Sequence, residues 1–174
     1  MAIGTDLTKY SNYIDKDKDE VPYEDVREDK KSTFYCFLSD FDNSIEHKTV
    51  IEQHYHDYIE IIYVVSGSVD VCINKKDFIA KSGDVLVAIP GDVHSFTRKK
   101  GTKYVCIQAD TNFLFSGILS NSDLHFIMPY TLYCHPEARL FTADVVDKTD
   151  IPRLIENIMI ENKEKRNFYM LSIR

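Results

Sequence analysis

The chain has 174 residues, with 28 Asp and Glu against 21 Lys and Arg, which gives a formal net charge of −7 at pH 7. This charge argues against a segment that grips the phosphate backbone of nucleic acid by itself, because such contacts need a clustered basic face. No window approaches the ~18 apolar residues that span a bilayer, and residues 1–10 lack the apolar core of a signal peptide. We therefore expect a cytoplasmic protein without a membrane partner.

Residues 1–32 form a polar segment with mixed-charge runs at 15–20 and 24–31. Neither a strand period nor a helix period runs through it. Such composition is typical of a flexible arm or of one draped over a partner. We expect a polar N-terminal arm ahead of the folded domain.

Residues 33–148 are expected to form one β-barrel domain. Many short strands at regular spacing, separated by turn signals, are typical of an antiparallel sandwich or barrel and not of a βαβ fold. The predicted strands lie at 34–38, 50–56, 60–66, 69–74, 78–80, 85–89, 94–98 and 103–109. Residues 112–119 fit a short helix or a strand, and residues 131–134 and 140–146 fit strands.

The cysteines do not form a disulfide or zinc-finger pattern. Cys36, Cys72, Cys106 and Cys134 lie far apart without a CxxC pair. Each lies in a strand-like run, where a free cysteine behaves as a small hydrophobic residue. We expect buried thiols.

Residues 149–174 are expected to be helical. One apolar stripe recurs at helical spacing, and it consists of Ile151, Leu154, Ile155, Ile158 and Met159. Thr149 or Asp150 caps the start, and the polar residues 162–167 interrupt the helix. A second apolar pattern runs to Arg174 without a stop signal, so we expect the protein to continue beyond it. The stripe fits a dimer contact or a cap on the barrel.

The segment from His54 to Glu60 concentrates groups that bind metals or polar ligands. His54, His56 and Glu60 all stand at even positions, and alternate residues of a strand share a face. His94 begins another predicted strand after a Pro-Gly-Asp turn, and a barrel would bring it beside the other three. Imidazoles with one carboxylate suit Zn, Ni, Mn or Fe(II). The four residues therefore predict one divalent transition metal, or a metal-free cluster in which they hydrogen-bond to one another.

These residues also resemble a known family. The pattern His54-x-His56-x-x-x-Glu60 with Gly67 resembles the first motif of cupins, and residues 83–94 resemble the second. The resemblance implies a mainly β fold, a double-stranded β-helix or jelly-roll barrel, here followed by C-terminal α-helices. In metal-dependent cupin enzymes the matching residues are the metal ligands.

The sequence departs from cupin enzymes in its second motif. Pro90 and His94 stand four apart and not five, and Arg98 takes the place of an Asn. The shorter spacing is similar to that in the sensing domains of AraC-type transcription regulators, as are the run at 54–67 and the tail from residue 154. This resemblance implies an effector-binding and dimerisation domain that senses a small molecule in the barrel. It would form a homodimer and reach DNA only through a C-terminal domain absent from this chain.

Two other functions stay open. A small metal-dependent cupin enzyme, an isomerase or oxygenase, would use His54, His56, Glu60 and His94, and a cupin-type binding protein would have no regulatory partner. In each case we expect the ligand pocket to be lined by Tyr58, Ile62, Phe96 and Arg98. Arg98 also fits a solvated strand end, because two lysines and a glycine follow it.

Overall fold

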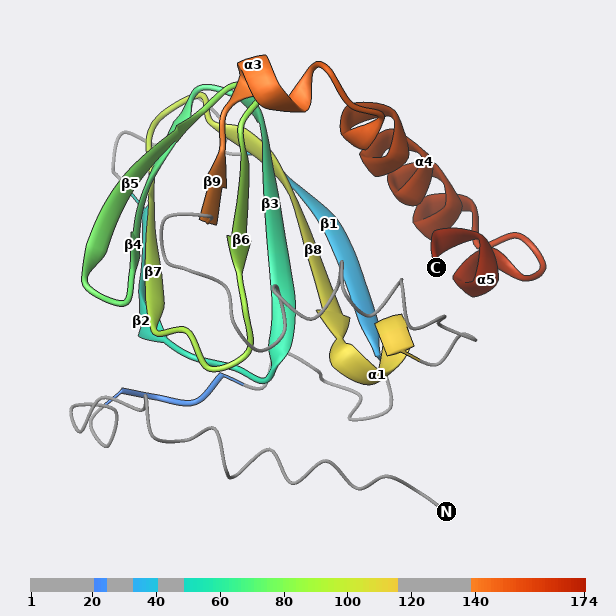
Figure 1. The fold of residues 1–174 in the computed structure, drawn as a ribbon, viewed down its shortest axis with the longest axis horizontal. Coiled ribbons are helices and arrows are strands. Elements are labelled where there is room, and N and C mark those ends of the chain that lie inside the picture. The colour runs from blue at the N-terminus through green and yellow to red at the C-terminus, as the bar shows by residue number, and fades with distance from the viewer. Residues whose placement is uncertain (1–20, 25–32, 41–48, 116–138) are drawn as a thin grey trace.

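The computed structural model describes residues 21–24, 33–40, 49–115 and 139–174 (Figure 1). Within these ranges the chain folds into two antiparallel sheets that face each other. The five-stranded sheet has the order β1 (Phe34–Asp40), β8 (Lys103–Asp110), β3 (Tyr58–Ser66), β6 (Val85–Ala88) and β9 (Leu140–Phe141). The four-stranded sheet has the order β2 (Thr49–His54), β7 (His94–Arg98), β4 (Ser68–Ile73) and β5 (Lys76–Lys81).

Each of the strands predicted between residues 34 and 109 is present, and neighbouring strands run antiparallel throughout. The helical alternative holds for the start of 112–119, where α1 spans Thr111–Phe115. The predicted strand at 131–134, like Cys134, lies outside the described residues.

The prediction of a strand over 140–146 is wrong beyond Phe141, because Ala143–Val146 form the short helix α3. A distant side chain starts this turn, since Oδ1 of Asp84 accepts a hydrogen bond from the backbone N–H of Ala143 at 2.8 Å. Gly83, with φ +87°, permits the close approach, because a Cβ there would meet that of Ala143 at 2.7 Å.

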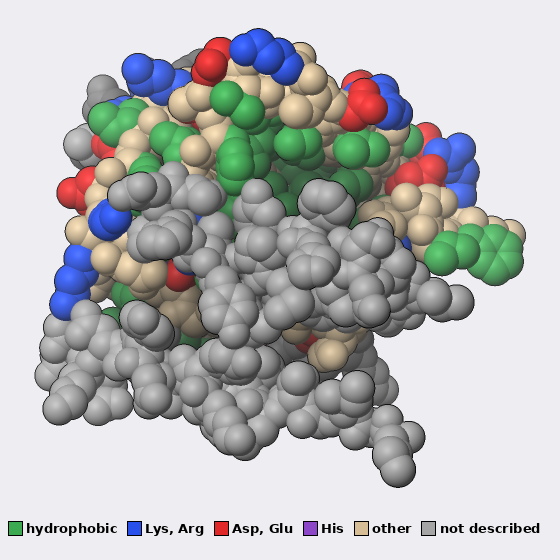
Figure 2. All heavy atoms as spheres, in the orientation of Figure 1, with side chains coloured by type: hydrophobic (Ala, Val, Ile, Leu, Met, Phe, Trp, Pro, Cys, Tyr) green, Lys and Arg blue, Asp and Glu red, His purple; other side chains and the backbone are tan. Residues whose placement is uncertain are grey.

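Both faces of the five-stranded sheet are largely buried at its central strands, which explains the near-continuous burial of β3. On β3, the even-numbered residues Ile62 and Val64 face the four-stranded sheet and form the barrel interior with Val71 and Phe96. The odd-numbered residues of β3 face the other way and build a second core with Val146 and Ile155. Figure 2 shows apolar side chains gathered over β6 and β3, below a rim of charged side chains.

A β-bulge lies in β2 beside the residues of interest. Ile51 pairs with Phe96 and His54 pairs with His94, so Glu52 and Gln53 stand opposite the single Ser95. The extra residue reverses the alternation, and the inward face of β2 passes from an odd position at Ile51 to an even one at His54.

The helix α4 (Ile151–Glu164) packs on the outer face of the five-stranded sheet (Figure 1), and α5 (Tyr169–Ile173) follows it. The side-chain amide of Asn162 donates to the carbonyl of Cys36 at 2.9 Å, and Sγ of Cys36 lies 3.4 Å from Sδ of Met159. The start is held by the hydroxyl of Thr149, which accepts from the N–H of Ile151, whereas Asp150 makes no side-chain cap. Among the described ranges, no helix has the length and apolar content needed to cross a membrane.

The predicted dimer stripe divides on this helix. Ile155, Ile158 and Met159 pack against the barrel, as a cap would. Ile151 and Leu154 remain 37% and 48% exposed. These two are the most exposed of the five predicted residues, whereas Ile158 and Met159 are half-buried and Ile155 is buried.

Candidate metal centre

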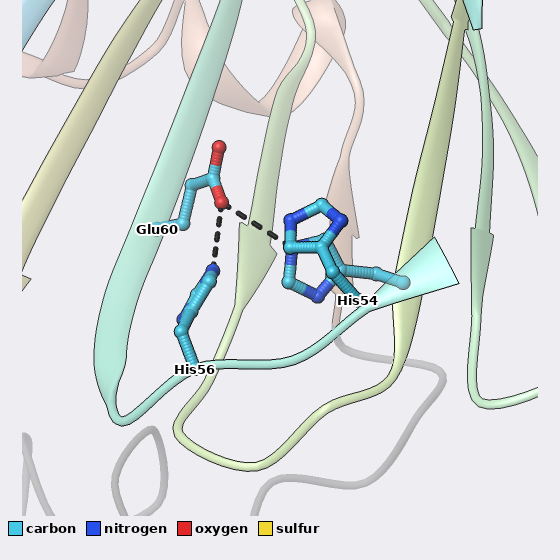
Figure 3. A group of neighbouring side chains, drawn as sticks. His54, His56 and Glu60 are labelled. Carbon is cyan, nitrogen blue, oxygen red and sulfur yellow. Dashed lines mark hydrogen bonds and ion pairs between the residues drawn. The ribbon is translucent and has the colours of Figure 1, made fainter. Parts of the chain in front are cut away.

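Both sheets supply side chains to one buried cluster. His54 ends β2 and His94 begins β7 in the four-stranded sheet, Glu60 lies on β3 in the five-stranded sheet, and His56 lies on the link between them. One ligand atom from each of the four lies within 4.8 Å of the others, and all four residues are buried. Figure 3 shows His54, His56 and Glu60 pointing toward a common centre.

The backbone fixes the orientation of each imidazole. Nδ1 of His54 lies 2.8 Å from the carbonyl of Glu52, that of His56 lies 3.1 Å from the carbonyl of Tyr58, and that of His94 lies 2.9 Å from the carbonyl of Asp92. A carbonyl oxygen only accepts, so each Nδ1 must carry the proton. In the neutral rings, all three Nε2 atoms therefore keep a lone pair, as in metal-ligating histidines.

These Nε2 atoms face carboxylate oxygens. Oε2 of Glu60 lies 3.0 Å from Nε2 of His56 and 3.3 Å from Nε2 of His94. The other oxygen of Glu60, Oε1, accepts a hydrogen bond from the thiol of Cys106 at 3.1 Å. Burial, and then the charge of Glu60, raise the pKa of Cys106, so this thiol stays protonated and remains a donor.

The pKa values of the group are governed by burial and by the interaction of Glu60 with the imidazoles. Burial alone would raise the pKa of Glu60, but the imidazoles of His56 and His94 lower it well below 4.5, so it is a carboxylate. Burial opposes a charge on His94, yet Glu60 outweighs it and raises the pKa of His94 above 6.5. Burial lowers the pKa of His54, which favours its neutral ring.

The residues present fit a transition metal. Among the described residues, the buried Nε2 of His94 has no aligned hydrogen-bond partner, although Glu60 lies close. A lone pair directed at a carboxylate is repulsive unless a proton or a cation lies between them. A divalent ion would accept three nitrogen lone pairs and one carboxylate oxygen at once, a donor set suited to Zn, Ni, Mn or Fe.

Two of the four predicted pocket residues lie against the histidine rings, one lies in the barrel interior and one lies away from the cluster. Tyr58 stacks on the ring of His56 with centroids 3.6 Å apart, and Phe96 lies 5.2 Å from the ring of His94. Ile62 belongs to the barrel interior. Arg98 stands at the other end of β7 from His94 and donates to the hydroxyl of Ser39, so it joins the two sheets away from the cluster.

Sequence reasoning missed three supporting residues. Glu24 places Oε2 3.1 Å from Nε2 of His54, and nothing in the polar arm signalled this contact. The alternation along β8 would have turned Cys106 inward, but its partner depends on the strand order. Arg139 places Nη2 3.1 Å from Asp92, whose carbonyl orients His94, and this pair links segments far apart in sequence.

Residues 44–108 match a protein family described as Cupin domain. Similar solved structures include KdgF from Halomonas sp., 20% identical over 44% of this chain and 68% of that chain, with a TM-score of 0.39. Bacillus subtilis oxalate decarboxylase, a protein with Mn(II) centres, is 20% identical over 53% of this chain and 23% of that chain, with a TM-score of 0.37. The EutQ protein of Clostridium difficile is 19% identical over 45% and 58%, with a TM-score of 0.36. The matches thus span less than two thirds of the latter two proteins, and no curated protein matches the chain.

The fold and the cluster define a double-sheet jelly-roll barrel with a group of His and Glu side chains inside it. Together with the match of residues 44–108 to that family, this arrangement resembles a cupin domain. The expectation of a mainly β, jelly-roll barrel followed by C-terminal helices is confirmed.

Proposed function

We propose that this domain binds one divalent transition metal through His54, His56, Glu60 and His94 and binds a small-molecule effector beside it. The observation that carries the proposal is the common orientation of the three imidazoles. Each Nδ1–H is committed to a backbone carbonyl, and the Nε2 atoms of His56 and His94 converge on one oxygen of Glu60. Fixing the second nitrogen in this way prepares imidazole as a ligand.

Four protein ligands leave coordination positions open on Ni, Mn or Fe, which commonly accept six donors. A small molecule with an oxygen or nitrogen donor would occupy them. The stacked ring of Tyr58 and the ring of Phe96 give the cluster an apolar wall, the usual setting of a ligand site.

The finer proposal is that the domain is the sensing half of an AraC-type transcription regulator. The spacing of Pro90 and His94 supports it, as does the contact of α4 with the barrel through Cys36, Met159 and Asn162. That contact gives a bound effector a physical route to the C-terminal helices, provided that the effector favours one helix packing over another. The protein would act in the cytoplasm as a homodimer, with 149–174 linking the 33–148 barrel to a DNA-binding domain.

The first test is metal content and DNA binding. The purified chain should hold one ion of Zn, Ni, Mn or Fe, measured by mass spectrometry after dialysis, and should regain it after chelation. A chain that holds and regains none of them contradicts the metal proposal.

With its net charge of −7 the chain should not bind duplex DNA selectively. Selective retardation of duplex DNA in a gel-shift titration would contradict the proposal that DNA is bound only by a separate C-terminal domain.

A metal-dependent isomerase or oxygenase is the second candidate. One observation favours it: the hydroxyl of Tyr58 is buried and has no hydrogen-bond partner in the part of the chain that the structure describes. Burial raises the pKa of Tyr58, so the hydroxyl would stay a donor toward a bound substrate. Turnover of a candidate substrate by the metal-loaded chain, lost in Tyr58→Phe with metal binding intact, would decide for the enzyme.

A further inference from the structure

A short piece of the N-terminal arm docks beside the metal-centre residues. The N–H of Glu24 donates to the carbonyl of Tyr55 at 2.9 Å, and the N–H of Tyr55 donates to the carbonyl of Pro22 at 3.3 Å. The hydroxyl of Tyr23 donates to Asp57 at 3.2 Å. Figure 1 shows this segment at the end of the barrel where β2 ends. Residues 21–24 are thus held against the link that carries His56.

This docking places a second carboxylate on a ligand atom. Oε2 of Glu24 lies 3.1 Å from Nε2 of His54, whose Nδ1 is committed to the carbonyl of Glu52. The side chain of His54 is 8% exposed and that of Glu24 is 40% exposed. Glu24 therefore lies on the solvent side of His54. It is not in the group whose ligand atoms all lie within 4.8 Å of one another, so its carboxylate would have to move inward to bind a shared ion.

The separations between these groups resemble those between neighbouring ligands on one ion. Two donors at right angles, each with a bond of about 2.1 Å, stand about 3.0 Å apart. Nε2 of His56 and Oε2 of Glu60 are 3.0 Å apart, and the contact of Glu24 with His54 has almost the same length at 3.1 Å. As in the buried cluster, a neutral imidazole and a carboxylate at this distance repel each other unless a cation or a proton intervenes.

We propose that Glu24 is a fifth, solvent-side ligand of the metal centre, supplied by the N-terminal segment. The inference rests on the proposed metal binding by the four buried residues. A bound ion would join residues 21–24 to the barrel, and a small molecule that needs this coordination position must displace the Glu24 carboxylate.

The test uses Mn²⁺ with the chelator-treated full chain, because this ion favours oxygen donors and its bound waters are counted by water-proton relaxation. Wild type is compared with Glu24→Gln and Glu24→Ala. The control is Glu52→Gln, which removes the same charge from an exposed side chain close to His54. Calorimetry gives the dissociation constant, and relaxation of the saturated complex gives the number of bound waters.

Glu24→Gln and Glu24→Ala should weaken Mn²⁺ binding about tenfold, in the range seen when groups around a metal are removed. Both should raise the relaxivity, because water takes the vacated position, whereas Glu52→Gln should change neither quantity. Unchanged or tighter binding, or weaker binding with unchanged relaxivity, overturns the assignment of Glu24 as a ligand. If wild type itself binds no Mn²⁺ and none of the other three metals, the proposed function fails. The two failures are therefore distinguishable.

Discussion

Cys106 donates its thiol hydrogen to Oε1 of Glu60 and leaves Oε2 to face the imidazoles. Both residues are buried, and the raised pKa of Cys106 keeps the donor hydrogen in place at neutral pH. A cysteine expected only to be buried thus orients the carboxylate of Glu60.

Replacing Cys106 should therefore change metal affinity in a graded way. Cys106→Ala removes the donor to Glu60 and should weaken metal binding by about 10-fold to 100-fold, as loss of such supporting groups does. Cys106→Ser keeps a donor and should retain most of the affinity. Calorimetric titration with Zn²⁺ measures both; equal affinity in the two variants would assign Cys106 a packing role only.

Metal removal should lower the stability of the fold. An ion that binds only the native state stabilises it by about 2.7 kcal/mol at a concentration of 100 times the dissociation constant. Thermal unfolding with chelator and with added Zn²⁺ should show this increment in wild type and in Glu52→Gln. His94→Gln loses a buried ligand, so its unfolding temperature should respond to neither addition. A full metal response in His94→Gln would remove that residue from the site.

The metal-free protein should be most stable near pH 6.5. The pKa of His94 is raised above 6.5 in the fold, so its contribution is complete below pH 6.5 and is lost as the pH rises through the folded pKa. The pKa of His54 is lowered, so stability falls as the pH drops below 6.5 toward its folded pKa. The pKa of Glu60 is lowered from 4.5, which adds a further loss below pH 4.5.

Thermal unfolding in chelator across this range tests both sides of the maximum. His94→Gln should remove the alkaline decline, and His54→Gln should remove the first part of the acid decline. A flat profile between pH 6.5 and 9 in wild type would show that His94 does not gain a proton on folding.

The division of the stripe on α4 predicts opposite behaviour for two adjacent residues. Ile155 is 5% exposed and packs in the outer core, so Ile155→Ala should destabilise the fold by about 2–4 kcal/mol. Leu154 is 48% exposed, and Leu154→Ala should change stability by less than about 0.5 kcal/mol. Urea unfolding of both variants measures the change in the free energy of unfolding. Equal losses would contradict the orientation of α4 that buries Ile155 and exposes Leu154.

Self-association should depend on the exposed part of the same helix. If the chain forms the proposed homodimer through Ile151 and Leu154, Leu154→Lys places a charge in an apolar contact and should raise the dimer dissociation constant. Sedimentation of wild type and Leu154→Lys at matched concentrations measures it. A wild-type monomer, or a mutant dimer as tight as wild type, excludes this interface.

Sequence periodicity predicted the barrel strands because their alternation is local. It failed at 140–146, where Leu140–Phe141 and the helix after them share one apolar pattern, and a hydrogen bond from Ala143 to the distant Asp84 decides between them. Nor can a stripe at helical spacing distinguish contact with its own barrel from contact with a second chain. Ile155 and Leu154 are equally apolar in the sequence, and only the position of the helix separates them.

The cluster itself was predictable from the motif and from the even positions of its residues, but the parity rule does not apply along the whole of β2. Parity holds along β3, whereas the bulge between Ile51 and His54 reverses it in β2. Glu24 lay beyond prediction, because its contact with His54 follows from the docking of a segment that has no period of its own.

The backbone carbonyls that hold the three imidazoles determine what side-chain mutagenesis of this site can reveal. The carbonyls belong to Glu52, Tyr58 and Asp92, and no side-chain substitution deletes a carbonyl. A substitution of the exposed side chain at position 52 should therefore leave the hydrogen bond of His54 in place. A scan that replaces each side chain in turn would not detect the carbonyls that orient the rings. Replacing one amide by an ester, which weakens the carbonyl as an acceptor, would reveal them.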